Sequence, residues 1–348
     1  MPLLFSIVIP VYNGAAHLER CLEAIGELSP APLECIVVDD GSTDGSVQAA
    51  GAAGATVISL TGRRGPAAAR NAGARAARGE ILMFVDADVV VPRDTVARFA
   101  ARFNADPDCA AVFGSYDTAP AGPGFISQYR NLLHCYTHQC GQERAFTFWT
   151  GCGAMRAHVF LAHGGFDESR TRPCIEDVEL GMRVSAAGGR ILLDKALQVQ
   201  HLKRIGFGNL LWTDFADRAV PWTRLLLRSQ HIPADLNLKW GQRVSVLAAG
   251  WFVLALAWAA LRPTSPGAGT LALSALLAVA LLAVVNRGFY RFLARIRGVP
   301  FALGAVPLHL VYFLCGGAGF VVGLVCKLWE TRTGRRAAAK SSAASPRL

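Results

Sequence analysis

Two aspartates, Asp86 and Asp88, lie on either side of one alanine directly after the apolar run Ile81–Val85. Carboxylates spaced in this way can hold a hard divalent cation, either Mg²⁺ or Mn²⁺. A cation held at this turn neutralises the charge of a bound diphosphate. A single D-x-D is equally typical of a solvated turn, so its meaning depends on the residues that accompany it.

Other polar groups also follow predicted strands. Asp39 and Asp40 precede Gly41 and Ser42, a combination typical of a turn. A carboxylate there either forms an Asx turn or accepts a hydrogen bond from a base or ribose. Arg70 lies early in a predicted helix, where it faces either solvent or a bound anion. With the acidic pair, these residues indicate a nucleotide site.

Glu176 and Asp177 open a later predicted helix. Acidic residues at a helix N-terminus are favoured by the helix dipole without any catalytic role. Alternatively, Asp177 is a general base that removes a proton from an acceptor hydroxyl. His201 ends an apolar run that begins at Ile191, where an imidazole is either structural or a third metal ligand.

The elements that position these groups alternate in type along the first 120 residues. The continuous apolar runs predict strands buried on both faces, and the order strand, helix, strand, helix predicts an α/β fold with a mostly parallel sheet covered by helices on both faces. Ligands of such sheets bind beyond the carboxyl ends of the strands, where the acidic turns lie. The predicted strands are Phe5–Val11, Leu33–Val38, Val57–Leu60 and Ile81–Val85.

Predicted helices connect these strands. Asn13 is expected to cap the first, which covers residues 15–25, and the second covers residues 66–78. Further on the pattern is less regular. It predicts strands at 111–116 and 146–149, a helix at 176–187, and a helix at 125–138 beside the acceptor side of the site.

The remainder of the chain is far more apolar. Residues 206–228 read as one or two amphipathic helices that lie on a bilayer surface. Uncharged stretches at 244–261, 269–285 and 301–326 are candidate spanning helices, and the third, which contains Pro307 and several glycines, either spans or is re-entrant. The basic segment 286–298 is predicted to be interfacial. The expected domains are residues 1–235, with interface helices from about 206, a transmembrane region at 236–330, and a disordered basic tail at 331–348.

The charge of the chain fits this division. The formal net charge is +10, but many basic residues flank the apolar stretches instead of forming one patch with interleaved aromatics. Anionic lipid and the positive-inside bias explain them better than nucleic acid, which is not an expected partner. Nine cysteines without a C-x-x-C pair suit a reducing compartment. No basic segment precedes the apolar run Leu3–Val11, so no signal peptide is expected and the first domain should face the cytosol.

Several segments taken in order resemble one known family. FSIVIPVYNG, VVDDGSTDGS, AAARNAGARAARGEILMFVDAD and TGCGAMR, followed by GGFDE and EDVELGMRVSAAGGRILL, are similar to the family 2 glycosyltransferases with a GT-A fold, of the membrane-anchored bacterial type. The resemblance covers about residues 4–202. It implies a UDP- or GDP-sugar donor, a Mg²⁺ or Mn²⁺ cofactor, and a multi-pass protein of the bacterial cytoplasmic (inner) membrane whose catalytic domain faces the cytoplasm.

The resemblance also implies roles for individual residues. On the donor side, some residues line the nucleotide pocket and others contact the base, the phosphate or the metal. These donor-side residues are Val11, Tyr12, Asn13, Asp39, Asp40, Arg70, Asp86 and Asp88. His201 matches a metal ligand found in some members. On the acceptor side, Asp177 of the E-D pair with Glu176 matches the catalytic base, and Gly151, Cys152 and Gly153 shape the acceptor site. Trp149 beside them either stacks on a sugar or belongs to the core.

The implied mechanism is a single in-line displacement that inverts the anomeric configuration. The Q-x-x-R-W signature of processive polysaccharide synthases is missing after the E-D pair, which disfavours polymer extrusion. Polyprenyl-phosphate glycosyltransferases, the main alternative, use an ionised phosphate acceptor that needs no base. The E-D pair therefore favours a hydroxyl acceptor, on a lipid or lipid-linked glycan. A dehydrogenase is disfavoured because no G-x-G-x-x-G follows the first strand; a catalytically inactive membrane scaffold is the remaining alternative.

Overall fold

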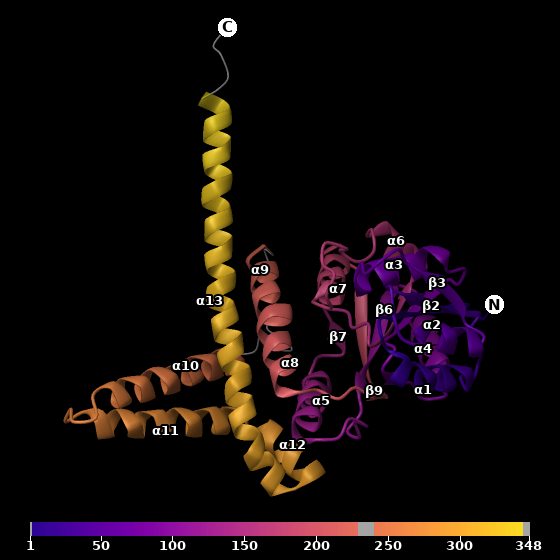
Figure 1. Cartoon of the computed structure of the whole chain (residues 1–348). Coiled ribbons are helices and arrows are strands. Elements are labelled where there is room, and N and C mark those ends of the chain that lie inside the picture. Colours follow the sequence, from indigo (N-terminus) through magenta and orange to yellow (C-terminus); the bar gives the residue numbers. More distant parts are fainter. Residues whose placement is uncertain (1, 229–239, 344–348) are drawn as a thin grey trace. The chain divides into compact units, whose positions relative to one another are not determined.

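The computed structural model describes residues 2–228 and 240–343, with side chains described as far as residue 330. The chain divides into two compact units, one ending at Gly206 and the other beginning at Phe207 (Figure 1). Residues 207–228, which are part of the predicted first domain of residues 1–235, therefore fall in the second unit.

The first unit is built on one nine-stranded sheet with the strand order β3-β2-β1-β4-β8-β6-β9-β5, and β7 pairs with β9. The first four strands are parallel, whereas β8 runs antiparallel between β4 and β6. The strands are β1 (Phe5–Val11), β2 (Glu34–Asp39), β3 (Thr56–Ser59), β4 (Ile81–Val85), β5 (Val89–Val90), β6 (Cys109–Tyr116), β7 (Arg144–Ala145), β8 (Cys152–Arg156) and β9 (Arg190–His201).

Helices cover both faces of this sheet, as the strand and helix order predicts. Alternate residues of β1 explain the layering: Ile7 and Ile9 pack under α1 and α4, whereas Val8 packs under α3, α6 and α7. The helices of this unit are α1 (Ala15–Gly26), α2 (Ser46–Ala52), α3 (Pro66–Ala76), α4 (Thr95–Ala105), α5 (Phe125–Gln139), α6 (Ala157–Ala162) and α7 (Glu176–Ala186). The α/β fold with a mostly parallel sheet is therefore confirmed.

Two local predictions are wrong. Residues 146–149 are not a strand; Phe148 is buried there because its ring meets Phe84 and Phe113 edge-on, so the apolar run reflects aromatic packing and not strand pairing. Asn13 does not cap α1. Its backbone is left-handed, with φ of 48°, and its side-chain oxygen accepts a hydrogen bond from the backbone N–H of Thr43 at 2.8 Å. Asn13 thus ties the loop after β1 to the loop after β2.

The second unit is helical. Among its described residues, three helices are long and apolar enough to cross a membrane: α10 (Trp240–Leu261), α11 (Ala268–Val285), and the Val299–Glu330 part of α13 (Val299–Ala343). The others are α8 (Phe207–Trp212), the π-helix η1 (Thr213–Ala219), α9 (Val220–Arg228) and α12 (Arg287–Arg297). The helix α10 packs against α11, and α12 packs against α13. The tail predicted to be disordered from residue 331 is helical as far as Ala343.

The glycines that suggested a break in the third apolar stretch serve packing instead. A Cβ atom at Gly319 would lie 2.3 Å from the Cβ of Ala219, and one at Gly323 would lie 2.8 Å from the Cβ of Thr223. These glycines let η1 and α9 approach the backbone of α13 closely. Because α13 runs without reversal through residues 299–330, the structure shows a continuous helix there and not a re-entrant loop.

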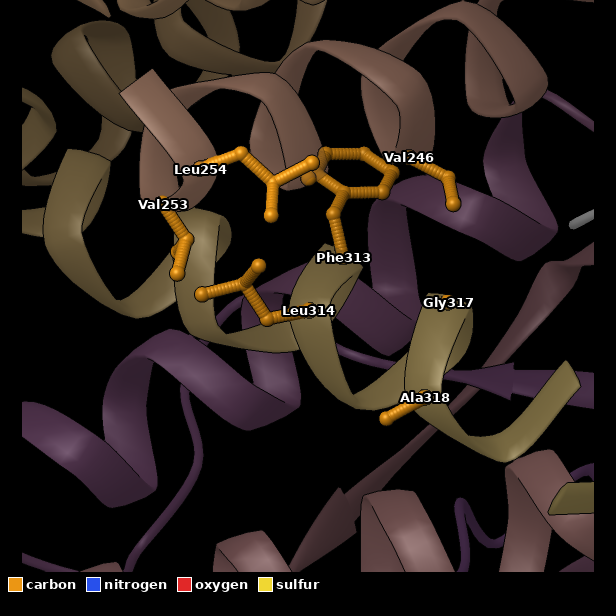
Figure 2. A pocket seen from close by; sticks show the side chains of 8 residues that line it. Val246, Val253, Leu254, Phe313, Leu314, Gly317 and Ala318 are labelled. Carbon is orange, nitrogen blue, oxygen red and sulfur yellow. The ribbon is translucent and has the colours of Figure 1, made fainter. Parts of the chain in front are cut away.

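A shallow apolar pocket opens between α10 and α13, where the side chains of Leu254, Phe313 and Leu314 face one another (Figure 2). Gly250 and Gly317 contribute no side chains, which leaves the space open. The same two helices are joined through the small cluster around Ala249 and Phe313. The pocket is therefore a gap in helix packing with an entirely apolar lining.

Candidate active site

The predicted acidic residues gather at the carboxyl end of β4. The key connection is Arg70, which is only 5% exposed and whose guanidinium donates to Asp86 Oδ1 at 2.7 Å and to Glu176 Oε1 at 2.9 Å. Arg70 lies in the first half of α3, and Glu176 is the first residue of α7, so two helices on one face of the sheet meet at this arginine. The D-x-D turn and the E-D pair, which are remote from each other in sequence, thus become one site.

The glutamate of this pair is fully engaged. Its second carboxylate oxygen, Oε2, accepts a hydrogen bond from the backbone N–H of Cys174 at 2.9 Å, while Oε1 faces Arg70. An arginine keeps its charge at all relevant pH values, so Glu176 and Asp86 share one permanent counter-charge. The contact of Arg70 with a base or phosphate stays a prediction; here Arg70 holds two carboxylates.

Asp177 has a different environment. The backbone N–H of Val178 donates to its Oδ1 at 2.8 Å, and the backbone N–H of Thr150 donates to its Oδ2 at 3.2 Å. Burial raises the pKa of Asp177 to about 6, the neighbouring charge of Glu176 adds to this rise, and Arg70 opposes it. A carboxylate with a pKa near the working pH is suited to general base catalysis.

A third group forms where β5 follows the D-x-D turn. The short strand β5 pairs antiparallel with the end of β9, so that Val89 faces His201. This pairing places Asp88 Oδ2 3.5 Å from His201 Nε2. Burial on its own would raise the pKa of Asp88, but His201 and the positive charge of Lys203 hold that pKa below its ordinary value.

Asp88 and His201 can be compared with the ligands that a divalent cation requires. Among residues 2–228 and 240–330, no three His, Cys, Asp or Glu side chains converge as a complete metal cage. Asp88 and His201 nevertheless offer one oxygen and one nitrogen that face each other. The carboxylate oxygen suits both Mg²⁺ and Mn²⁺, the imidazole nitrogen favours the transition metal Mn²⁺, and such ions commonly take their remaining ligands from phosphates and water. These two residues therefore fit the cation, while Asp86, the third predicted ligand, directs Oδ1 at Arg70.

The loops after β1 and β2 hold the predicted nucleotide contacts. Asp39 accepts a hydrogen bond from the backbone N–H of Ser42 at 2.9 Å, which is an Asx turn. Asp40 accepts from the backbone N–H groups of Arg64 and Gly65, directly before α3 begins. Both aspartates therefore hold the backbone of the loops that follow β2 and precede α3. A direct contact between either of them and a base stays a prediction.

Residues 11–13 face in different directions. Val11 is buried in the core and its carbonyl accepts the backbone N–H of Asp40. Tyr12, by contrast, is 41% exposed, and the guanidinium of Arg63 lies 4.2 Å from its ring centre. Sequence reasoning missed Arg63, although the segment Gly62–Gly65, with two arginines between glycines, carried a signal for an anion-binding loop.

The predicted acceptor segment is shaped by its glycines. A Cβ atom at Gly151 would lie 2.2 Å from the indole of Trp149, and one at Gly153 would lie 2.3 Å from the Trp149 carbonyl oxygen. Only glycine lets the indole fold back over this turn. Cys152 is buried in β8 opposite Val85 of β4, which brings the turn beside the D-x-D strand. Trp149 packs against Tyr116, and its contact with a sugar stays a prediction.

Comparison with known proteins places these features in a family. Residues 6–162 match the family described as Glycosyl transferase family 2. The pre-mycofactocin glycosyltransferase of Mycobacterium tuberculosis is 31% identical over 208 residues, covering 56% of this chain and 42% of that protein. The validoxylamine A glucosyltransferase of Streptomyces hygroscopicus subsp. limoneus is 30% identical over 232 residues, covering 53% of this chain and 48% of its own length. The chain thus spans less than half of the length of each of these relatives.

A solved structure is similar over nearly the whole chain. The mannosyltransferase of Pyrobaculum calidifontis, determined in complex with GDP-Man and Mn²⁺, aligns with a TM-score of 0.50 at 22% identity and covers 95% of this chain and 88% of its own. At this identity the similarity establishes the fold alone. Residues 6–162 therefore belong to a family 2 glycosyltransferase domain, and the fold is GT-A.

Proposed function

We propose that the chain is an inverting, metal-dependent glycosyltransferase that moves a sugar from a nucleotide-sugar donor to a hydroxyl group of a lipid or lipid-linked glycan. The observation that carries this proposal is the placement of Asp177 beside the carboxylates held by Arg70. Its pKa of about 6 makes this carboxylate suited to move a proton at neutral pH.

The proposed step balances without further reagents. Asp177 accepts the proton of the acceptor hydroxyl as the acceptor oxygen forms a bond to the anomeric carbon. The bond from that carbon to the donor diphosphate breaks on the opposite side, and the diphosphate leaves with the electron pair. Asp88 and His201 would hold the divalent cation, which would neutralise the charge of the leaving diphosphate. Holding the reactants in line contributes the remainder of the rate enhancement.

The charges around Asp177 favour a hydroxyl acceptor over a polyprenyl phosphate. Three carboxylates, those of Asp86, Glu176 and Asp177, share the single guanidinium of Arg70. Once Asp177 has lost its proton, this group carries an excess of negative charge that repels an anionic acceptor. A neutral hydroxyl approaches without this penalty and requires the base that Asp177 provides.

The donor and the location are supported by different observations. A similar structure holds GDP-Man and Mn²⁺, and the names of the curated relatives refer to pre-mycofactocin and to validoxylamine A. Three helices of sufficient length and apolar composition support attachment to a membrane. Basic residues beside these helices, such as Arg243 and Lys327, support the cytoplasmic side of a bacterial inner membrane.

The proposal is tested with the full chain purified in detergent. UDP- and GDP-sugars are screened for hydrolysis or transfer with Mn²⁺, with and without a bacterial lipid extract. We expect one donor to turn over, more rapidly with lipid, and Asp88→Ala to abolish turnover. Asp94→Ala is the matched control, because it removes an exposed carboxylate of the same loop region that pairs with Arg98 of the following helix. No turnover, together with no Mn²⁺-dependent nucleotide binding, would instead support the inactive scaffold.

A further inference from the structure

The imidazole of His201 is held on three sides. Its Nδ1 lies 2.8 Å from Asn131 Oδ1, its face stacks on the ring of Tyr116 with centroids 4.7 Å apart, and its Nε2 faces Asp88. The histidine is 7% exposed. Of these partners, Asn131 is the one whose chemistry decides which ring nitrogen carries the proton.

The orientation of the Asn131 amide follows from its second hydrogen bond. Its Nδ2 donates to the backbone carbonyl of Ser127 at 3.0 Å, one turn earlier in α5. A carbonyl can only accept, so the amide nitrogen must face Ser127 and the amide oxygen must face His201. His201 therefore donates from Nδ1–H to Asn131, and in its neutral form the lone pair lies on Nε2.

The segment after β9 is fixed to the same helix. The hydroxyl of Ser127 accepts a hydrogen bond from the backbone N–H of Ile205 at 2.7 Å and donates to the Ile205 carbonyl at 3.3 Å. Asn131 is 2% exposed, so water does not replace it. The distance between Asn131 and His201 is thus set by two connections between α5 and the end of β9, which lie one helical turn apart along α5.

The lone pair on Nε2 points at an anion. At 3.5 Å, Asp88 Oδ2 and His201 Nε2 are farther apart than a charge-assisted hydrogen bond, which is about 2.7–2.9 Å long. While the ring is neutral, these two electron-rich atoms repel each other unless a proton or a metal cation lies between them, and a divalent metal cation is the one that also binds a diphosphate. We propose that Asn131 is a positioning residue, which holds His201 in the tautomer and orientation that make Asp88 and His201 a joint site for the divalent cation. This inference rests on the metal dependence of the proposed function.

Binding of Mn²⁺ tests this role independently of sugar transfer. The full chain in detergent is titrated with Mn²⁺, with UDP and with GDP in turn, and free Mn²⁺ is measured by electron paramagnetic resonance. Asn131→Leu keeps the volume but removes the acceptor, and Asn131→Asp keeps an acceptor for Nδ1–H. Both variants lose the donor to Ser127, so they differ in the contact with His201.

We expect Asn131→Leu to weaken Mn²⁺ binding about 10- to 100-fold, the usual effect of removing the hydrogen-bond partner of a ligating histidine, and Asn131→Asp to bind within about threefold of the unmodified protein. Thr137→Val is the matched control, since it removes a hydroxyl from the same helix that contacts Leu133 and not His201. It should bind Mn²⁺ normally. Should Asn131→Leu not fold, Asn131→Met removes the same acceptor with a more adaptable side chain.

Three results would overturn the inference: unchanged Mn²⁺ affinity in Asn131→Leu, an equal loss in Asn131→Asp, or no Mn²⁺ binding by the unmodified protein with either nucleotide. An equal loss in both variants would mean that Asn131 only stabilises α5. The expected pattern of Mn²⁺ affinities without turnover of any sugar donor would instead contradict the proposed function and leave the role of Asn131 standing.

Discussion

The two units of the chain differ in how much of their large apolar side chains is exposed. In the first, the strand residues Ile7, Val8 and Phe84 are fully buried. In the second, large apolar residues are exposed, and Leu247 and Leu261 of α10 expose 75% and 80% of their surface. Exposed apolar surface marks a protein–protein or membrane contact, and this helix has the length and composition to cross a membrane. Hydrophobicity alone therefore does not distinguish a buried apolar residue from an exposed one; its periodicity and the length of the segment do.

The buried polar residues differ just as clearly. Those of the first unit include the charged Asp39 and Asp40 at the end of β2, and Arg70 of α3, whose guanidinium reaches Asp86 after β4. In the described part of the second unit, Asp214 is buried as well, but the other buried polar residues are neutral ones such as Asn286, which follows α11 and donates to Ser245 of α10 at 2.8 Å. Buried charge is costly and persists where chemistry needs it. Under the proposed function, catalysis belongs to the first unit and attachment to a membrane to the second, and the following experiments test that division.

The largest effect is expected from Asp177→Asn. Loss of a general base lowers kcat about 10²- to 10⁴-fold. The melting temperature should not fall, because the site penalises the ionised form of this carboxyl and the amide relieves that penalty. Rates and thermal unfolding of the detergent-solubilised variant check both parts. Retained activity would favour a phosphate acceptor and contradict the assignment of Asp177 as the base.

Arg70→Met should chiefly affect stability. It leaves Asp86 and Glu176 without their shared counter-charge, and removal of one partner of a buried ion pair costs about 3–5 kcal/mol. We expect the lower end, since the Asp86 side chain is 30% exposed. Urea unfolding monitored on the first unit measures the change. Arg287→Gln on the exposed face of α12 is the control, with an expected effect within about 0.5 kcal/mol. An equal loss of unfolding free energy in Arg70→Met and Arg287→Gln would contradict the claim that buried charge matters more in the first unit than exposed charge does in the second.

Gly319→Ala tests packing in the second unit. The added methyl meets Ala219, and overpacking costs about 1–3 kcal/mol. Gly250→Ala is a matched change, because a Cβ atom added there would have no neighbour within 4 Å and alanine favours a helix. Thermal stability in detergent should fall for the first variant and hold or rise for the second. A drop in both would indicate general intolerance of α10 and α13 to substitution, and not a specific contact.

The smallest effect is the dependence on pH. With its pKa raised to about 6, Asp177 is mostly protonated at pH 5, so kcat should be about tenfold lower there than at its plateau above pH 7. The contribution of Asp177 to folding stability changes with pH in the opposite direction to kcat. The raised pKa stabilises the folded state fully below pH 3.8, and this contribution is lost as the pH rises through 6. A flat profile of kcat between pH 5 and 7 would argue against Asp177 as the titrating base.

The sequence predicted the elements whose signals are local. The apolar runs of β1 and β4, the helix that begins at Pro66, and the acidic turns at strand ends all carry their own patterns. The strand β8 was missed because its five residues, Cys152–Arg156, include a glycine and pair with strands remote in sequence. Asn131 carries no motif at all. Its contact with His201 forms only when α5 packs beside β9, and no hydrophobic periodicity in the sequence predicts that contact.

The pairing of β5 with β9 limits where residues can be inserted in this chain during evolution. Side chains alternate across a strand, so one inserted residue between Leu197 and His201 would turn the imidazole to the opposite face. Insertions in the exposed segment 167–173 would leave that register untouched. Homologues built on this scaffold should therefore differ in the lengths of such loops, while the spacing between the end of β9 and the D-x-D turn stays constant.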